Sequence, residues 1–281
     1  MIVVTGATGN VGRPLVRGLA AAGAPVRAVA RNLPGDEAIE GVDYRQADLT
    51  DAGSLRPALE RADALFLLLA GDLLGGAVDP NDLVGQVKAA GVSRVVVLSS
   101  QAVGTRPEAA AYGGLRALEA AVQGSGLEWT ILRPGGFYTN AYAFVEPVRE
   151  QGVVVAPFGD VGLPMLDPAD VAAVAAAVLC EDGHAGRTYE LTGPALLTPR
   201  KQAEEIGRAL GTDVGFVELT RDQARENMLR FMPEPVADAT LTILGEPVAA
   251  EQKVRTDVER VTGRAPRAFG EWAADNSMVF R

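Results

Sequence analysis

A glycine-rich turn near the start of the chain constrains the fold more than any other feature. The residues Thr5-Gly6-Ala7-Thr8-Gly9-Asn10-Val11-Gly12 follow a short β-branched run and precede a stretch of helical spacing. Between a strand and a helix, Gly6 lets the chain turn sharply, Gly9 lets a diphosphate approach the backbone, and Gly12 lets the helix pack closely on the strand. This context predicts a dinucleotide-binding turn, with a glycine turn that holds no ligand as the alternative.

Backbone N–H groups at the start of a helix bind anions. We therefore expect this turn to contact the cofactor through Gly6, Thr8, Gly9, Asn10 and Val11. Asn10 is also a suitable N-cap for the first helix, because its side-chain oxygen can accept from a free backbone N–H.

Through the first half of the chain, short β-branched runs alternate with stretches of helical spacing. This alternation is typical of a parallel sheet that is covered by helices on both faces. We predict strands at 2–5, 25–30, 42–46, 64–69, 94–99 and 128–132, and helices near 11–22, 54–60, 81–90 and 115–125. The expected fold is therefore α/β, with a Rossmann-type doubly wound parallel sheet and a smaller C-terminal substrate lobe.

Glycine and proline become frequent after Pro134, where we expect the substrate side to begin. We assign 1–134 to a dinucleotide-binding domain and 135–281 mainly to a substrate-binding lobe that is interleaved with it. Segments near 153–156 and 187–192 are expected to complete the sheet. Capping residues predict further helices that begin at Pro168, at Pro199 and after Thr220. The last forty residues carry few such signals.

The charge and cysteine content exclude several classes of function. A formal net charge of -10 opposes a general attraction to nucleic acid or anionic membranes. The single cysteine, Cys180, excludes an internal disulfide and a multi-cysteine metal site, and we expect it to be buried on a helix. The only histidine, His184, lies in a polar turn, and no metal-ligand spacing is recognised, so no metal is expected. The chain begins with a predicted strand rather than a signal segment, which favours a cytoplasmic protein without membrane association.

The end of the second predicted strand indicates the cofactor. In dinucleotide-binding folds an acidic residue at this position accepts from the ribose hydroxyls, whereas an arginine can pair with a 2′-phosphate. Arg31 occupies this position, with Asp36 and Glu37 nearby. We therefore expect NADP(H) to be preferred over NAD(H), with a solvated surface arginine as the alternative.

Several segments resemble the NmrA-like group of atypical short-chain dehydrogenase/reductases, which includes quinone reductases and redox-sensing regulators. Besides the glycine turn, the resemblance is carried by Ala47-Asp48-Leu49-Thr50-Asp51, Val97-Leu98-Ser99-Ser100, Gly126-Leu127-Glu128-Trp129-Thr130-Ile131-Leu132-Arg133-Pro134 and Gly186-Arg187-Thr188-Tyr189-Glu190-Leu191-Thr192-Gly193. The segment that ends in Trp-Thr-Ile-Leu-Arg-Pro is more specific than the glycine motif.

The resemblance implies positions for the parts of the dinucleotide. Asp48 and Leu49 should lie beside the adenine, and Leu69 and Ala70 beside the adenosine ribose. The nicotinamide end should be lined by Ser99, Ser100, Pro134, Gly136 and Phe137. The alternatives are a loop cap for Asp48, a core position for Leu69 and satisfied strand-end hydroxyls for the serines.

Ordinary short-chain reductases pair a tyrosine with a lysine four residues later, and this lysine lowers the pKa of the tyrosine. The only lysines here, Lys88, Lys201 and Lys253, do not follow any tyrosine at that spacing. The nearest analogue is Tyr112 with Arg116, and Tyr112 is a candidate proton donor or a residue that only shapes the pocket. With Ser100, these two residues are our catalytic candidates.

Aromatic and methionine side chains gather after the sixth predicted strand, and they could hold a flat apolar ligand. Tyr138 and Asn140 are the candidates for orienting it. With the resemblance, this favours an NADPH-dependent reductase of a quinone or related conjugated carbonyl, acting as a monomer or homodimer on a small aromatic substrate. The alternative is a non-catalytic sensor that binds the dinucleotide and reports to a protein partner.

Overall fold

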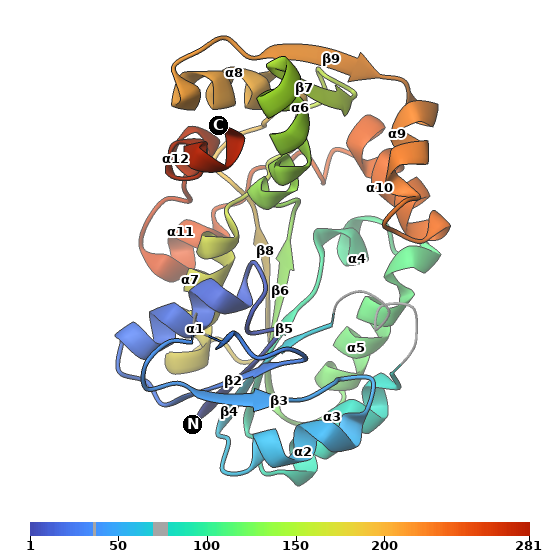
Figure 1. Ribbon diagram of the computed structural model, residues 1–281. Helices are drawn as coiled ribbons and strands as arrows, with labels where there is room; N and C mark the ends of the chain where they lie inside the picture. Colours follow the sequence, from blue (N-terminus) through green and yellow to red (C-terminus); the bar gives the residue numbers. More distant parts are fainter. Residues whose placement is uncertain (36–37, 70–77) are drawn as a thin grey trace.

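The computed structural model describes residues 1–35, 38–69 and 78–281, and within these residues seven parallel strands form one sheet (Figure 1). The strands lie in the order β3-β2-β1-β4-β5-β6-β8, so the chain runs outward from β1 in one direction and then in the other. This doubly wound order confirms the predicted Rossmann-type α/β fold. The strands are β1 (Ile2–Thr5), β2 (Val26–Ala30), β3 (Asp43–Gln46), β4 (Ala64–Leu68), β5 (Arg94–Leu98), β6 (Glu128–Pro134) and β8 (Arg187–Leu191).

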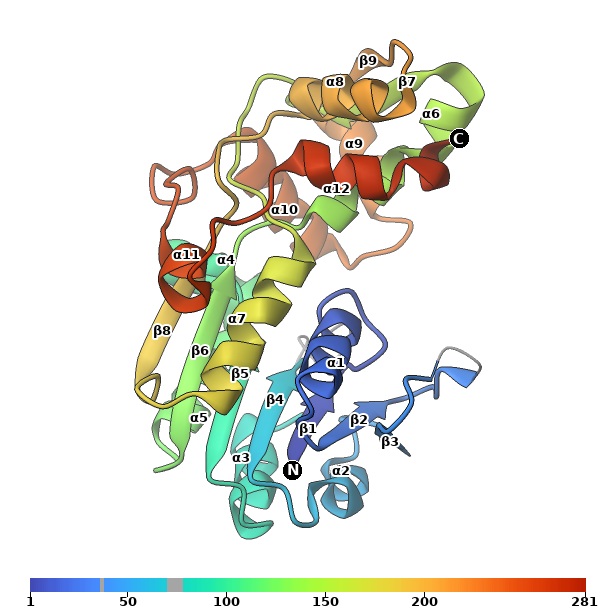
Figure 2. The ribbon, with the colours of Figure 1, turned by 90° about the vertical axis from the view of Figure 1, so that its left-hand side faces the viewer.

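Helices cover both faces of this sheet (Figure 2). One face carries α1 (Gly12–Ala21), α7 (Pro168–Cys180) and α11 (Asp257–Thr262), and the other carries α2 (Ala52–Leu59), α3 (Pro80–Ala89) and α5 (Gly113–Gln123). Successive strand residues point to opposite faces, so Val4 packs in the α1 and α7 layer while Val3 packs in the α2, α3 and α5 layer. Burial on both faces explains why the central strands are continuously apolar.

The helix starts follow the capping residues of the sequence. The Asp167 side chain accepts from Ala169 N at the start of α7, and Thr198 accepts from Lys201 N at the start of α8 (Pro199–Leu210). Thr220 forms the expected capping box with Gln223 at the start of α9 (Arg221–Met228). A side-chain oxygen at each N-cap satisfies a backbone N–H that the helix itself leaves unpaired.

The second half of the chain adds a lobe above the carboxyl ends of the strands (Figure 2). A separate core holds this lobe together, and its large side chains include Tyr138, Phe269, Trp272 and Phe280. The further elements are α4 (Gln101–Thr105), η3 (Ala110–Tyr112), η4 (Tyr138–Phe144), α6 (Val145–Gln151), β7 (Val153–Pro157), β9 (Gly215–Leu219), α10 (Glu234–Gly245), α12 (Phe269–Asp275) and η5 (Ser277–Phe280).

The structure corrects three expectations. The segment near 187–192 joins the main sheet as β8, but the segment near 153–156 forms β7, which pairs with β9 in a separate sheet of the lobe. Asn10 is not the N-cap of α1, because Val11 occupies that position without a side-chain cap. Cys180 is exposed, since it is the last residue of α7 and lies beyond the helix's buried stretch. In the part of the chain that the structure describes, no helix combines the length and apolar character needed to cross a membrane.

Candidate cofactor and active site

The glycine turn between β1 and α1 has the geometry that its sequence predicts. Gly6 adopts a left-handed backbone with φ of 61°, which lets the chain reverse directly after the strand. A Cβ at Gly12 would lie 2.1 Å from the carbonyl oxygen of Gly6. Only glycine therefore lets α1 begin this close to the turn.

The same turn presents unpaired backbone donors. The N–H groups of Thr8, Asn10 and Val11 find no acceptor among the described residues, whereas Gly9 N donates to Gly6 O at 3.0 Å. The turn lies beside the carboxyl end of β1, at the N-terminus of α1. Free N–H groups at a helix start fit a diphosphate, so the turn suits the bridge of a dinucleotide.

The Asn10 side chain connects this turn to the lobe. Its Nδ2 donates to Thr139 Oγ1 at 3.2 Å, and Thr139 belongs to η4. The side chain therefore points away from the first turn of α1, which explains why it does not cap the helix.

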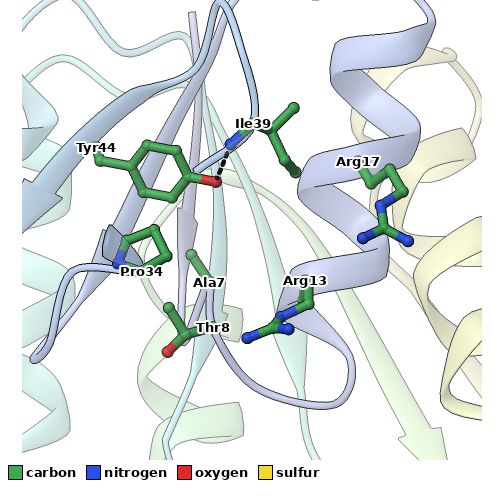
Figure 3. A pocket seen from close by; sticks show the side chains of 7 residues that line it. All are labelled: Ala7, Thr8, Arg13, Arg17, Pro34, Ile39 and Tyr44. Atoms are coloured by element: carbon green, nitrogen blue, oxygen red, sulfur yellow. Dashed lines mark hydrogen bonds between the residues drawn. The ribbon is translucent and has the colours of Figure 1, made fainter. Parts of the chain in front are cut away.

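A pocket of about 360 Å³ lies between α1 and the segment that follows β2 (Figure 3). Arg13 and Arg17 lie one turn apart on α1, and Arg13 extends toward Thr8 of the glycine turn. The opposite wall is apolar and is formed by Pro34, Ile39 and Tyr44, whose hydroxyl accepts from Ile39 N at 3.2 Å.

Two guanidinium groups at i and i+4 repel each other on an isolated helix. Arg17 has no ion pair among the described residues. The pocket therefore suits a ligand that has an apolar ring and an anionic group.

Arg31 lies outside the lining of this pocket. Its side chain is exposed, and its carbonyl oxygen accepts from Gln46 Nε2 at 2.8 Å. The backbone N–H of Thr50 donates to the Asp48 carboxylate and lowers its pKa, and the charge of Arg31 lowers this pKa further. Asp48 is thus a loop-capping carboxylate at the surface, with Arg31 within electrostatic reach.

The other residues assigned to the adenosine half have side chains in the core. Leu49 and Leu69 are buried in the layer beneath α2 and α3. Only their backbone can border a ligand. Ala70 lies outside the described residues.

Ser99 and Ser100 follow β5 but have different partners. The buried Ser99 hydroxyl donates to Glu119 Oε1 at 2.5 Å, and Glu119 in turn accepts from Nε and Nη2 of Arg133. Ser99 is therefore part of an internal network under the site. Ser100 is half-buried, and its Oγ accepts from Ala102 N to cap α4.

A second pocket, of about 190 Å³, lies where β5 and β6 end and meets α10 of the lobe. It brings together most of the residues assigned to the nicotinamide end and to catalysis. Its lining includes Ser100, Gln101, Ala102, Tyr112, Pro134, Gly135, Gly136, Asn140, Leu163, Met165, Thr240, Ile243, Leu244 and Glu251. Phe137 is not in this lining, and it packs partly against the α7 layer.

Tyr112 faces a different cation from the one expected. Arg116 Nη1 donates to Ala109 O at 2.9 Å and so tethers the loop before α5. Burial raises the pKa of the Tyr112 hydroxyl, the Glu251 carboxylate raises it further, and Arg106 lowers it. Tyr112 is therefore a protonated phenol at neutral pH, and it lines the pocket.

Tyr138 is a core residue rather than a pocket residue. It is 2% exposed, its hydroxyl donates to Arg267 O at 3.1 Å, and its ring packs edge-on against Phe269. The sequence assigned it to substrate binding with Asn140, but only Asn140 lines the pocket. Aromatic composition could not separate a core tyrosine from a pocket tyrosine.

Sequence reasoning missed charged residues on both sides of the site. Arg13 follows Gly12 directly, and its spacing to Arg17 could have indicated an anion site on α1. The ion pair of Arg106 with Glu251 joins residues 145 positions apart, so no local pattern could have indicated it.

Comparison with known proteins identifies the family. A family model described as NAD(P)H-binding matches residues 6–182, which span the glycine turn and most of the sheet. The chain belongs to the NAD(P)H-binding family. This membership confirms the cofactor class that was expected from the turn.

Relatives of this NAD(P)H-binding protein cover its whole length. A (4-alkanoyl-5-oxo-2,5-dihydrofuran-3-yl)methyl phosphate reductase of Streptomyces griseus is 38% identical over 100% of this chain and 99% of its own. An NAD(P)H azoreductase of Xenophilus azovorans is 33% identical over 100% and 99%. These full-length matches confirm an NAD(P)H-dependent oxidoreductase.

Solved structures agree with this assignment. The NADPH-dependent quinone oxidoreductase of Escherichia coli, in complex with NADPH, superposes with a TM-score of 0.82 at 27% identity, over 98% of this chain and 99% of that chain. The negative transcriptional regulator NmrA, in complex with NADP, has a TM-score of 0.77 at 22% identity, over 99% and 95%. The NmrA likeness shows a shared fold, as the sequence resemblance implied.

Proposed function

We propose that the protein reduces a quinone or a related conjugated carbonyl compound with hydride from NADPH. The observation that carries the proposal is the pocket in which Tyr112 and Asn140 meet Pro134 and Gly136 at the carboxyl end of β6. In open α/β sheets, ligands bind in the crevice beyond these strand ends. The reductase and azoreductase names of the full-length relatives support the same class of reaction.

The preference for NADP(H) is supported by the arginines around the adenosine side. Arg31 follows β2, and Arg13 and Arg17 line the pocket between α1 and Tyr44. Guanidinium groups pair with phosphate oxygens through charge-assisted hydrogen bonds. We assign the 2′-phosphate to Arg13 and Arg17, with Arg31 beside the adenosine.

When bound, the nicotinamide supplies the hydride, which carries both electrons. The chain supplies orientation and a proton donor. Asn140 and Tyr112 hold the carbonyl oxygen of the acceptor, and the Tyr112 hydroxyl donates to the oxygen on which negative charge develops. Water then restores this proton, so a quinone leaves as the hydroquinone. A quinone delocalises the developing charge, which explains how the reaction proceeds without the missing lysine.

Steady-state oxidation of NADPH, followed by absorbance with 1,4-benzoquinone and with an enone as acceptors, tests the proposal. The matched control is Gly9→Asp, which places a carboxylate where the diphosphate would lie and abolishes turnover. If wild-type protein binds NADPH but consumes it no faster than this variant, the protein is a sensor and the reductase proposal is wrong.

A further inference from the structure

The carboxylate of Glu251 is buried beside the acceptor pocket and has a full set of partners. Glu251 lies in the loop after α10 and is 2% exposed. Its Oε1 accepts from Thr105 Oγ1 at 2.9 Å and from Arg106 Nε at 2.8 Å. Its Oε2 accepts from Arg106 Nη2 at 2.8 Å and from Val248 N at 2.9 Å. Four donors therefore fix this one side chain in place.

Arg106 binds two points of the loop that contains Glu251. Besides its paired bonds to the carboxylate, Nη2 donates to the carbonyl oxygen of Glu246 at 2.8 Å. Arg106 is the C-cap of α4, the short helix that follows β5. The pair thus connects the loop after α10, which belongs to the lobe, to the segment that follows the carboxyl end of β5.

The pair also determines where one wall of the pocket lies. Thr240, Ile243 and Leu244 of α10 line the pocket together with Ser100 and Tyr112. Leu244 lies two residues before Glu246, whose carbonyl oxygen accepts from Arg106. Any shift of the loop would therefore move the end of α10 and change the width of the pocket.

A role in stability alone does not explain this arrangement. The cost of desolvating two charges often exceeds their attraction, and well-packed apolar residues can replace a buried ion pair with little loss of stability. What a paired carboxylate and guanidinium supply is a defined geometry. Here the paired side chains lie beside the wall of the pocket that α10 forms.

We propose that the Arg106–Glu251 pair determines acceptor specificity by holding α10 at a fixed distance from Tyr112. The inference rests on the proposed reductase function. A pocket of about 190 Å³ is smaller than typical ligand pockets of about 300–1,000 Å³. The acceptor that this pocket favours is a planar quinone or enone of one or two rings, over longer azo compounds such as methyl red.

The test compares kcat/KM for 1,4-benzoquinone and for the azo dye methyl red, with NADPH as donor. The double variant Arg106→Met/Glu251→Met removes both charges without leaving either one unpaired. The matched control is Arg255→Met/Glu190→Met, which removes another partly buried arginine–glutamate pair that does not line the pocket.

In the pocket variant, we expect kcat/KM for benzoquinone to fall at least about tenfold while that for methyl red is unchanged or rises, with the dissociation constant of NADPH unchanged. The control variant should change kcat/KM for the two acceptors by the same factor. If the double variant does not fold, Glu251→Gln, which keeps the side-chain volume and removes the ion pair, is compared with Glu190→Gln as its matched control.

If kcat/KM falls equally for both acceptors in a folded pocket variant, the pair only supports folding. That result would overturn the inference while the reductase function stands. A wild-type protein that reduces neither acceptor would overturn both.

Discussion

The hydroxyl of Ser99 donates to the buried carboxylate of Glu119, 20 residues later in the chain. Arg133 of β6 completes the network through two further bonds to the same carboxylate. Strand β5, helix α5 and strand β6 are therefore tied together directly under the acceptor pocket. The sequence assigned Ser99 to the nicotinamide, but its hydroxyl is committed to this internal network.

Removing one partner of this network should destabilise the protein strongly. Arg133→Met leaves the Glu119 carboxylate, 4% exposed, without its cation. Isolating a buried charge costs about 3–5 kcal/mol. We expect urea unfolding to show that the free energy of unfolding falls by this amount. The double variant Glu119→Leu/Arg133→Met should recover most of this free energy. An equal decrease in both variants would contradict this account.

Substitution of the α1 arginines should change the preference for the cofactor. Charge-assisted hydrogen bonds contribute about 1.5–3 kcal/mol each, so Arg13→Ala and Arg17→Ala should each weaken NADPH binding about 10- to 100-fold. NADH binding should be unaffected. Calorimetric titration with both cofactors measures this difference.

Arg31→Ala is the comparison variant for the cofactor preference. We expect Arg31→Ala to weaken NADPH binding less than Arg13→Ala does. If Arg31→Ala alone abolishes the preference, the 2′-phosphate lies at Arg31, as the sequence first indicated. If none of the three variants weakens the binding of NADPH more than that of NADH, the assignment of the 2′-phosphate to this pocket is wrong.

Loss of the Tyr112 hydroxyl should slow the reaction without preventing it. A positioned proton donor contributes about 10²–10⁴-fold in general, and a quinone needs less help than an alcohol or ketone, so Tyr112→Phe should lower kcat about 10- to 100-fold. Burial raises the pKa of Tyr112, and therefore the phenol stays protonated between about pH 6 and 9.

The wild-type rate should accordingly show no alkaline decline in this range. A decline that disappears in Tyr112→Phe would mean that the pKa of the tyrosine is depressed, as in ordinary short-chain reductases. Steady-state rates against pH for both proteins distinguish these outcomes.

The sequence predicted features that depend on neighbouring residues. The glycine turn, the strand positions and the capped starts of α7, α8 and α9 all depend on residues within a few positions of one another. The partner of β7 is β9, which begins 58 positions beyond Pro157 in the lobe, so local pattern could not separate it from the main sheet.

The same limit applies to the candidate site. The sequence assigned Ser100, Pro134 and Gly136 to the nicotinamide end by resemblance, and Tyr112 and Asn140 to the reaction and its substrate. These residues line one pocket, and their roles stay predictions. Tyr138 was misplaced because the aromatic core formed by α12 was not visible in the sequence. The ion pairs of the site join distant segments and needed the structure.

A methyl group at Gly12 should disrupt the cofactor turn. The added Cβ would approach the Gly6 carbonyl oxygen to 2.1 Å, so the turn or the start of α1 must move. We expect Gly12→Ala to lower the melting temperature and to lose the stabilisation that NADPH gives to wild type. Gly18→Ala, at a helical glycine with open space around its Cβ position, is the control and should do neither. Scanning calorimetry with and without NADPH measures both effects.

Transfer of deuterium from labelled NADPH to an enone tests the central claim most directly. The two C4-deuterated stereoisomers are supplied in separate reactions, and the saturated product is analysed by mass spectrometry. If the pocket places the acceptor against the nicotinamide, one stereoisomer will add a single deuterium to the β-carbon of the product and the other will add none. If NADPH binds but neither stereoisomer labels the product of any enone tested, and no quinone tested oxidises NADPH, hydride transfer in this pocket is contradicted.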